Sequence, residues 1–379
     1  MEQFDVLVVG GGPAGSTVAA QCAARGLCVG LVEHKRFPRH KVCGDVINPH
    51  CWPVFERLGV AGLVRALPHQ ELSGATFTTQ QGATLTIDHS GLWAVRRSLL
   101  DAVLLDHAKS CGVTVYEGEV AHDARPGWRV STTHHEFTAP VLVGADGRHS
   151  LIAKQAGLAC HHNSARGGAI ALQAHFHAPA GTDDRVQLHL FPGGYCGIVR
   201  VDATQLNLCL VTDRAGAAHH GDCGQLFAQT AGRNPQFRAL GLLPEPLGPL
   251  QSAHPLRTPP NRPCGDGAFL VGDALRAVEP FTGQGIFFAL RTGELAAQAI
   301  CEGTEFSTAV RRLYLQRGMT NELLRRLMYH ESSAGVVVAV LRRFPALQHW
   351  LAGTVLSSGR PARSGRRAPR APCGPAPID

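Results

Sequence analysis

The sequence predicts an α/β protein in which a mainly parallel, helix-covered sheet is interrupted by a mostly antiparallel sheet and followed by a helical C-terminal part. Three observations predict this fold. The chain opens with a strand–helix–strand pattern within about thirty residues. Stretches of alternating polarity between residues 161 and 262 are typical of antiparallel strands with one exposed face. Apolar residues then recur at helical spacing after a buried strand at 268–271.

The opening unit is defined by apolar runs and by glycine and proline. The apolar run Phe4–Val9 ends in glycines, and a helix Pro13–Arg25 follows, with proline at its favoured first position. Gly26 is a plausible helix end. The second strand, Cys28–Val32, is followed directly by Glu33.

The later elements follow from the same patterns. We expect a helix at Leu99–Cys111, strands at Val113–Tyr116 and Pro140–Val143, antiparallel strands at Val186–Leu190, Gly197–Val201 and Leu206–Val211, a buried strand at Ala268–Val271 and a helix from Ile286 to Ile300. The division that follows is a discontinuous nucleotide-binding domain (1–70, 92–158 and 264–303), an inserted substrate domain (71–91 and 159–263), C-terminal helices (304–356) and a disordered Arg/Pro-rich tail (357–379).

Composition excludes several classes of protein. Of 379 residues, 44% are hydrophobic and 17% charged, which excludes wholesale disorder and collagen-like structure. No apolar run approaches the roughly 20 residues of a membrane-spanning helix, and the acidic start MEQFD does not resemble a secretory signal. We therefore expect a cytoplasmic protein without a transmembrane segment, with peripheral membrane contact left open.

Cysteine spacing and charge exclude two further classes. The twelve cysteines never fall in a CxxC spacing, so they are interpreted mostly as buried small hydrophobes rather than as a disulfide framework or zinc ribbon. The formal charge of +7 includes five arginines and one aspartate in the tail Ser357–Asp379, so the body is only mildly basic and nucleic-acid binding is not indicated.

The first chemical motif is Gly10-Gly-Gly12-Pro13-Ala14-Gly15 at the turn from the first strand into the first helix. Glycines allow the backbone to approach a pyrophosphate, and the helix N-terminus supplies N–H groups and partial positive charge. Glu33 ends the next strand, where its carboxylate can accept hydrogen bonds from ribose hydroxyls. This context predicts a Rossmann-like dinucleotide-binding unit, whereas the glycine pattern alone is weak in a chain with 43 glycines.

A second motif follows the strand at 268–271. Gly272-Asp273 places a carboxylate at the carboxyl end of that strand, and Pro280, Gly283, Gly285 and Ile286 lie in the glycine-rich start of the next helix. This pattern again suits a polyhydroxylated, phosphorylated ligand.

The motifs together resemble a known family. VVGGGPAGS with Glu33, FPRHKVCGD (37–45), VRRSLLD (95–101), GADGRHS (144–150) and VGDALRAVEPFTGQGI (271–286) occur in the order seen in two-domain FAD oxidoreductases of the para-hydroxybenzoate hydroxylase type. FPRHKVCG is most similar to the geranylgeranyl-reductase-like branch. The resemblance spans residues 4 to 300 and implies FAD as the cofactor.

The resemblance also implies roles for individual residues. Gly10, Gly12 and Gly15 would hold the FAD pyrophosphate and Glu33 the adenosine ribose, while Arg97 would lie near the ribityl–phosphate stretch. Asp146 and Gly147 would form a further fingerprint, Asp273 would bind ribityl hydroxyls, and Gly283 to Gly285 would approach the flavin ring. Lys41, Cys43 and Gly44 would border the flavin, and Lys41 and Cys43 are the candidate catalytic residues, against a packing role for Cys43.

The substrate side is less defined. Tyr195 is the candidate substrate residue, but Gly194-Tyr195-Cys-Gly-Ile-Val199 lacks the Tyr-x-Trp-x-Phe-Pro stretch of the prenyl reductases, and the Trp-x-Trp-x-Ile-Pro signature of flavin halogenases is also absent. The histidines, with pairs at 134–135, 161–162 and 219–220 and with His175-x-His177, show no recognisable metal spacing, so no metal is expected. One of them could serve as an acid or base.

These observations predict an FAD-dependent oxidoreductase acting on a small, apolar or aromatic molecule. Because only one complete dinucleotide fingerprint is present, we expect NADPH or NADH to bind transiently and reduce the flavin. The reduced flavin would then deliver a hydride to a carbon–carbon double bond. The alternatives are hydroxylation of an aromatic ring, or a flavoprotein that binds or acts on a partner protein.

Overall fold

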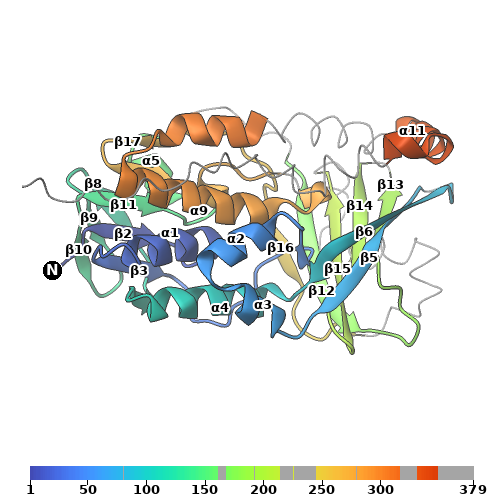
Figure 1. Ribbon diagram of the computed structural model, residues 1–379, viewed down its shortest axis with the longest axis horizontal. Coiled ribbons are helices and arrows are strands. Elements are labelled where there is room, and N and C mark those ends of the chain that lie inside the picture. Colours follow the sequence, from blue (N-terminus) through green and yellow to red (C-terminus); the bar gives the residue numbers. More distant parts are fainter. Residues whose placement is uncertain are drawn as a thin grey trace, which may run out of the picture.

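The computed structural model describes residues 1–79, 81–160, 168–191, 193–213, 225, 245–278, 280–315 and 331–348. Two large sheets lie next to each other along the long axis of the molecule (Figure 1). The sheet formed largely by the N-terminal third lies at one end with its helices, and the larger sheet lies at the other end.

The first large sheet has six strands and is mainly parallel. Its order is β17 (Cys264–Gly265), β18 (Ala268–Leu270), β11 (Val141–Gly144), β2 (Val6–Val9), β3 (Val29–Glu33) and β7 (Thr114–Glu117), with only β17 antiparallel to its neighbour. Every residue of β2 and β3 is buried. This explains why both strands are nearly continuous apolar runs rather than alternating ones.

Three helices pack together in the same half of the molecule. Helix α1 (Pro13–Ala23) lies between α4 (Arg97–Ser110) and α9 (Gly285–Glu302), and it contacts both (Figure 1). Almost all of α1 is buried, which its small residues Ala14, Gly15 and Ala19 permit. Helix α1 begins shortly after β2, and the 3₁₀ turn at Gly272–Ala274, which comes just after β18, contacts both α1 and α9. The carboxyl ends of those two strands therefore lie in the same region as these helices.

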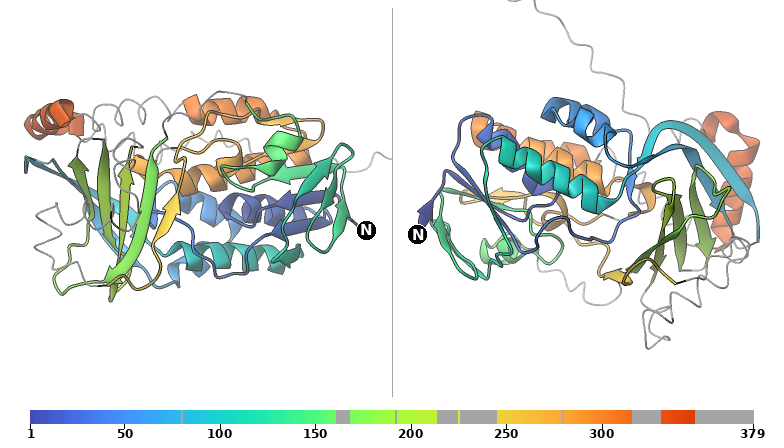
Figure 2. Two further views of the ribbon diagram at one scale, coloured as in Figure 1. Left: turned by 180° about the vertical axis from the view of Figure 1, so that it is seen from behind. Right: turned by 90° about the horizontal axis from the view of Figure 1, so that it is seen from below.

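The second large sheet has eight strands. Its order is β16 (Gln251–Ala253), β12 (Ile170–His177), β15 (Gln205–Thr212), β14 (Gly194–Arg200), β13 (Val186–Phe191), β5 (Gln70–Thr78), β6 (Thr84–Ala94) and β4 (Val46–Ile47). All neighbours are antiparallel except β13 and β5. Figure 2 shows this sheet from behind and from below. The hairpin β5–β6, which is distant in sequence, thus extends the sheet built by residues 170–253.

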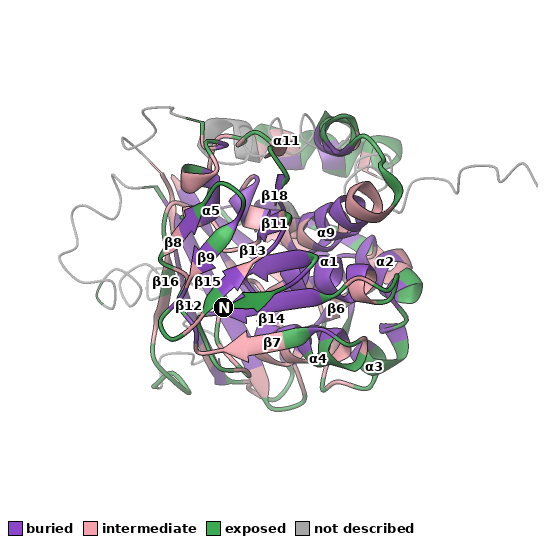
Figure 3. Cartoon of the chain, turned by 90° about the vertical axis from the view of Figure 1, so that its left-hand side faces the viewer, coloured by how far each residue is buried: buried purple, intermediate pink, exposed green. Residues whose placement is uncertain are grey.

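The remaining elements are short or peripheral. They are β1 (Glu2–Gln3), β8 (Asp123–Arg125), β9 (Arg129–Ser131) and β10 (Glu136–Thr138), which form a small sheet, the helices α2 (Cys51–Leu58), α3 (Ala61–Arg65), α5 (Leu151–Gln155) and α11 (Glu331–Arg343), a helical stretch at 306–315 and the 3₁₀ turns η1 (Gly272–Ala274) and η2 (Pro280–Thr282). Figure 3 shows that buried residues are concentrated in the inner strands and helix faces, whereas β7 is mostly of intermediate burial and many connections are exposed.

The predicted fold class is confirmed, with small shifts at the ends of elements. Helix α1 ends at Ala23 rather than Arg25, because its last turn tightens: Arg25 N–H donates to the Cys22 carbonyl at 3.1 Å and Gly26 N–H to the Ala23 carbonyl at 2.9 Å. Helix α4 begins two residues before the predicted Leu99. The four-part division of the chain remains a prediction.

Some sequence-based expectations fall outside the described residues. These are the histidine pairs 161–162 and 219–220, Cys223, Cys373 and the tail 357–379. Among the described cysteines, the expectation of general burial is wrong in part: Cys22, Cys51, Cys196 and Cys209 are buried, but Cys28 and Cys160 are exposed. Among the described helices, none has the length and hydropathy to span a bilayer.

Candidate active site

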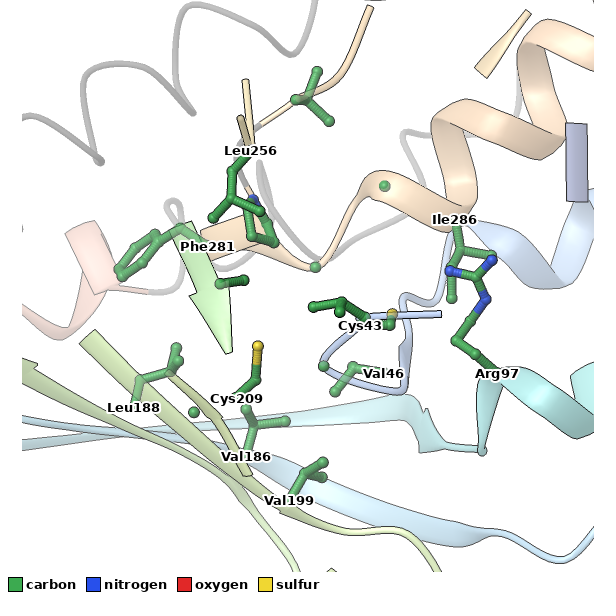
Figure 4. A pocket seen from close by; sticks show the side chains of 18 of the residues that line it. Cys43, Val46, Arg97, Val186, Leu188, Val199, Cys209, Leu256, Phe281 and Ile286 are labelled. Carbon is green, nitrogen blue, oxygen red and sulfur yellow. The ribbon is translucent and has the colours of Figure 1, made fainter. Parts of the chain in front are cut away.

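One cavity of about 260 Å³ is lined by residues of the eight-stranded sheet and by loops and helix starts that follow strands β2, β11 and β18 of the six-stranded sheet. Figure 4 shows the loop of Cys43 extending into it, with Arg97 and Ile286 on one side and the strands carrying Leu188, Val186 and Val199 on the other. One part of the wall is polar and is built from helix N-termini and loops. The other part is apolar and is built from the eight-stranded sheet.

The glycine-rich turn between β2 and α1 forms part of the polar wall. Gly10 has φ +107°, and a Cβ there would clash with the Ala145 carbonyl, while a Cβ on Gly15 would clash with the carbonyl of Gly10. These two glycines therefore shape the turn against the protein itself. Gly12, Pro13 and Ala14 line the cavity directly.

Glu33 contacts this turn through its carboxylate. It is buried, and its carboxylate accepts hydrogen bonds from Gly11 N–H at 2.7 Å and Lys35 N–H at 2.9 Å. Burial raises the pKa of Glu33, but His34, Arg39 and these N–H groups lower it more, so the net pKa is below its ordinary value. The carboxylate is thus ionised and fixes the turn.

Asp273 lies between two cations in the cavity wall. Its carboxylate lies 3.6 Å from Lys41 Nζ and 3.5 Å from an Arg148 guanidinium nitrogen. Burial acts to raise the pKa of Asp273, but Lys41, Arg148 and Arg97 together lower it. For Lys41, Asp273 acts to raise the pKa, while burial and the guanidiniums of Arg97 and Arg39 bring it below its ordinary value.

Arg97 is buried at the start of α4 and also lines the cavity. Its guanidinium makes two hydrogen bonds of 2.8 Å to the Asp101 carboxylate, which also pairs with Arg39 at 3.0 Å. Burial acts to lower the pKa of Arg97, but Asp101 raises it above its ordinary value, so the cation is permanent. Arg97 is therefore a buried positive charge in the cavity wall, fixed by Asp101, rather than a surface residue.

Cys43 lies in the loop between β3 and β4. Its N–H donates to Gln173 Oε1 at 3.0 Å, and its carbonyl accepts from Asn207 Nδ2 at 2.8 Å. Burial raises the pKa of the Cys43 thiol, and the nearby Arg97 offsets this only partly. The thiol is therefore protonated at neutral pH and is not an activated nucleophile.

A buried polar network below this loop was not predicted from the sequence. Asp45 accepts hydrogen bonds from Arg97 N–H at 3.1 Å, His175 Nε2 at 2.7 Å and Asn207 Nδ2 at 2.9 Å. With Gln173, these residues tie the Cys43 loop and the start of α4 to β12 and β15. We call Asp45, Gln173, His175 and Asn207 the Asp45 network.

The sequence does contain a pattern that indicates the Asp45 network. Gln173 and His175 are polar residues two apart on β12, and Asn207 pairs with His175 in register on β15. Their neighbours on the opposite face, such as Leu172 and Leu208, belong to an apolar core. When both faces of a strand are buried and one face carries polar side chains, those side chains need a hydrogen-bonding partner inside the protein.

Asp146 and Gly147 of the GADG segment after β11 have different roles. Asp146 accepts from Ser150 Oγ at 2.6 Å and from Leu151 N–H at 2.7 Å, so its carboxylate stabilises the N-terminus of α5. Burial raises the pKa of Asp146 although these hydrogen bonds act to lower it. Gly147 lines the cavity beside Arg148. The local cap thus accounts for Asp146 without a ligand contact.

The N-terminus of α9 completes the polar wall. Gly272, Pro280, Gly283, Gly285 and Ile286 all line the cavity together with Lys41, Cys43 and Gly44. The N-termini of α1 and α9 thus open onto one space. Their partial positive charges, together with Lys41, Arg97 and Arg148, suit an anionic group such as a diphosphate.

The apolar wall contains the predicted Tyr195. Its ring is buried and lies edge-on to Phe281, with centroids 5.3 Å apart. Most of the apolar residues around them come from the eight-stranded sheet, and the others from loops, α9 and α11: Val46, Ala75, Phe77, Leu85, Ile87, Leu92, Ala171, Val186, Leu188, Ile198, Val199, Leu256, Val278, Ala289, Val337 and Leu341. Within the described part of the chain, no group of three or more His, Cys, Asp or Glu side chains could hold a metal ion.

Comparison with known proteins identifies the family. Residues 3–192 match the model of the FAD binding domain, so the chain belongs to that family. It is 29% identical over 80% of its length to menaquinone reductase of Mycolicibacterium smegmatis, covering 78% of that protein. It is 28% identical to digeranylgeranylglycerophospholipid reductase 2 of Methanopyrus kandleri, with 80% and 78% of the two chains covered.

The fold is also that of solved flavoproteins. A flavin-dependent brominase superposes with a TM-score of 0.76 at 20% identity, covering 94% of each chain. The protein is an FAD-dependent oxidoreductase with the two-domain fold of this family. The cavity fits FAD, because its polar wall combines two helix N-termini, a glycine turn and the charged side chains of Lys41, Arg97, Arg148 and Asp273. Glu33 does not line the cavity and contacts the glycine turn through Gly11 N–H.

Proposed function

We propose that this enzyme reduces a carbon–carbon double bond of an apolar small molecule, with its FAD reduced by NADPH or NADH. The FAD would lie along the polar wall, from the turn at Gly12 to the N-terminus of α9. The substrate would lie against the apolar wall of the eight-stranded sheet, with Cys43 between the two regions.

One observation carries this proposal. The charged residues among those that line the cavity are Lys41, Arg97, Arg148 and Asp273, and all four belong to the polar wall. In the described part of the eight-stranded sheet, Tyr195 and Cys209 are the only lining residues whose side chains can form hydrogen bonds. A substrate with a carboxylate would have no charged partner there, and its burial would be costly.

An apolar pocket of this kind suits an isoprenoid-like chain. Apolar surface removed from water contributes about 25 cal/mol per Å², without any directional contact. Both similar curated proteins named above are reductases, one of menaquinone and one of digeranylgeranylglycerophospholipid. This supports reduction as the reaction and a lipid-like molecule as the substrate class.

Reduction of a double bond adds one hydride to one carbon and one proton to the other. Bound FAD, once reduced, supplies the hydride. The proton must come from an acid beside the apolar wall. Burial keeps the Cys43 Sγ protonated, and Tyr195 carries a hydroxyl in the same cavity, so these two groups are the candidate proton donors.

The polar residues have positioning roles in this scheme. Asp273, held between Lys41 and Arg148, offers an acceptor to sugar-alcohol hydroxyls. Arg97 carries a permanent positive charge toward the diphosphate region. NADPH or NADH would bind transiently, because the sequence contains one complete dinucleotide fingerprint.

Aromatic hydroxylation is the second candidate function. Phe77, Tyr195 and Phe281 place three aromatic rings in the cavity wall, and such edges can hold a flat ring. The absence of charged lining residues on the described sheet disfavours the phenolic acids that such enzymes would have to orient.

The experiment mixes the FAD-loaded protein anaerobically with NADPH or NADH, and then with a polyprenyl alcohol. Bleaching of the flavin band followed by reoxidation on addition of the alcohol, with product heavier by one H₂ per double bond, is the expected result. A product that gains oxygen after admission of air would establish the hydroxylase instead. A flavin that neither nucleotide bleaches would refute direct reduction by NADPH or NADH.

A matched pair of variants tests the position of the substrate. Leu188 faces the cavity, whereas the next residue on β13, His189, faces away from it. Leu188→Asn should raise the KM for the polyprenyl substrate at least tenfold, since a buried leucine contributes about 1.5–3 kcal/mol. His189→Gln should leave KM unchanged at neutral pH. Equal KM values for both variants would refute the placement.

A further inference from the structure

The C-terminal helix α11 and the residues after it have two apolar faces. The inner face, Val337, Val338 and Leu341, packs on Leu85 and Ile87 of β6, and Val337 and Leu341 also line the cavity. Gln348 Nε2 donates to the Thr86 carbonyl at 2.6 Å, which ties the end of the segment to the same strand. The segment is therefore fixed on the sheet over the apolar part of the cavity.

The outer face is apolar but exposed. Val336 is 62% exposed, Val340 38%, Phe344 56% and Leu347 41%. Val336 and Val340 lie one turn apart on α11, and Phe344 and Leu347 follow in the segment after the helix ends at Arg343. We call these four residues the outer stripe.

Exposed large hydrophobic side chains are concentrated in the outer stripe. In the described part of the chain nine large hydrophobic side chains are exposed, and four of them lie in this one segment. Isolated exposed hydrophobic residues are ordinary, whereas a contiguous exposed apolar patch marks an interaction site. This concentration makes the stripe a candidate docking surface.

Charge next to the stripe indicates what it binds. Arg342 and Arg343 are both exposed and lie between Leu341 and Phe344. The sequence beyond residue 348 adds five more arginines and a single acid, Asp379. An apolar helix face flanked by arginines is complementary to an anionic lipid bilayer, where the apolar side chains enter the acyl boundary and the arginines meet phosphate groups.

We propose that the outer stripe, on α11 and the segment after it, docks this enzyme on an anionic membrane surface, so that an apolar substrate passes from the bilayer along α11 into the cavity. The route rests on the apolar substrate proposed above, whereas the docking surface does not. The same helix contacts the cavity with one face and the bilayer with the other. A substrate of low water solubility would therefore not have to cross water to reach the active site.

Vesicle flotation of the full-length, FAD-loaded protein tests this proposal. Phosphatidylcholine vesicles are compared with vesicles that also contain phosphatidylglycerol. We expect the protein to float with the anionic vesicles and weakly with the neutral ones. Replacement of all four stripe residues (Val336→Ser, Val340→Ser, Phe344→Ser and Leu347→Ser) should lower the partition coefficient at least tenfold.

Controls separate lipid binding from misfolding. All four side chains are exposed, so the quadruple variant should retain FAD and its thermal unfolding midpoint. Leu63→Ser with Val120→Ser, which removes exposed apolar side chains elsewhere, should float like the wild type. Arg342→Gln with Arg343→Gln should reduce binding to anionic vesicles about fivefold per arginine and weaken its salt dependence.

Three results would overturn the docking proposal. They are a wild-type protein that floats with neither vesicle, a quadruple variant that floats as well as the wild type, and a lipid-free dimer that the quadruple variant abolishes. The last result would assign the stripe to a second copy of the chain. Flotation needs no turnover, so failure of the reductase assay with stripe-dependent flotation would refute only the proposed function.

Discussion

Replacement of Asp45 by asparagine would test whether the Asp45 network holds the Cys43 loop. Asp45 is 1% exposed and accepts three hydrogen bonds, from the backbone of Arg97, from His175 and from Asn207. It also has φ +57°, a conformation that asparagine tolerates. Asp45→Asn therefore keeps the size and backbone and changes only the charge and one acceptor.

The expected loss of stability follows from these contacts. In Asp45→Asn, the side-chain oxygen can accept a hydrogen bond either from Arg97 N–H or from His175 and Asn207. The new NH₂ group then faces a donor that the oxygen does not reach. One hydrogen bond to a charged group, about 1.5–3 kcal/mol, is lost, and a buried donor is left unsatisfied at about 1–3 kcal/mol. Together we expect Asp45→Asn to lower the free energy of unfolding by about 2.5–6 kcal/mol.

The assay is urea unfolding of the protein with FAD bound, followed by tryptophan fluorescence. Asp106→Asn is the matched control, because Asp106 is exposed and its 3.0 Å pair with Lys109 lies on the surface. That variant should change stability by less than about 1 kcal/mol. A cycle with His175→Gln should give a coupling energy of about 0.5–3 kcal/mol. If Asp45→Asn unfolds at the urea concentration of the wild type, the network does not stabilise the loop.

Three further predictions concern the cofactor, the thiol and acid stability. Asp273→Ala should weaken FAD binding at least tenfold, and Glu33→Ala less, since one charge-assisted hydrogen bond contributes about 1.5–3 kcal/mol. Fluorescence titration of the apoprotein with FAD measures both, and full retention of tightly bound FAD would refute the assignment. Cys43 should be alkylated by iodoacetamide far more slowly than exposed Cys28 at neutral pH, because burial raises its pKa; peptide mass mapping after timed alkylation decides this. Burial lowers the pKa of His189 to about 4, so the folded state resists its protonation. Stability contributed by neutral His189 is complete above about pH 6.5 and is lost as the pH falls toward 4. His189→Gln should flatten this part of the stability–pH curve, measured by urea unfolding, and an unchanged slope would contradict the reasoning.

The parallel sheet could be predicted from the sequence because its signals are local. Strands β2 and β3 are buried on both faces and so contain nearly uninterrupted apolar residues, and glycine and proline mark the ends of α1. The glycine turn could be placed, but not the reason for each glycine. Gly10 and Gly15 are required by neighbouring protein backbone, whereas Gly12 faces the cavity.

The Asp45 network could not be predicted, because its members meet only through tertiary pairing. His175 and Asn207 are adjacent because β12 and β15 pair in register, and Asp45 reaches them from a loop 130 residues earlier in the chain. The same holds for the pairing of Lys41 and Arg148 with Asp273. Periodicity indicates a polar face on β12 and β15, but composition and periodicity describe each segment separately and do not identify the partner of that face.

The arrangement of polar and apolar groups in the cavity follows from which sheet supplies each wall. Parallel strands end at one edge, so the β2 and β18 ends bring two helix N-termini and Asp273 together, and charge collects there. The antiparallel sheet alternates, so one face of β13 and β14 must be apolar if it is to be buried at all, and that face becomes the other wall. The loop of Cys43 lies between them because Asp45 fixes it to β12 and β15. If the proposed function holds, the sheet contacts the substrate and the loop contributes to the chemistry, so Leu188→Asn should alter KM and Cys43→Ala should alter kcat. A Cys43→Ala variant with unchanged kcat would leave Tyr195 as the proton donor.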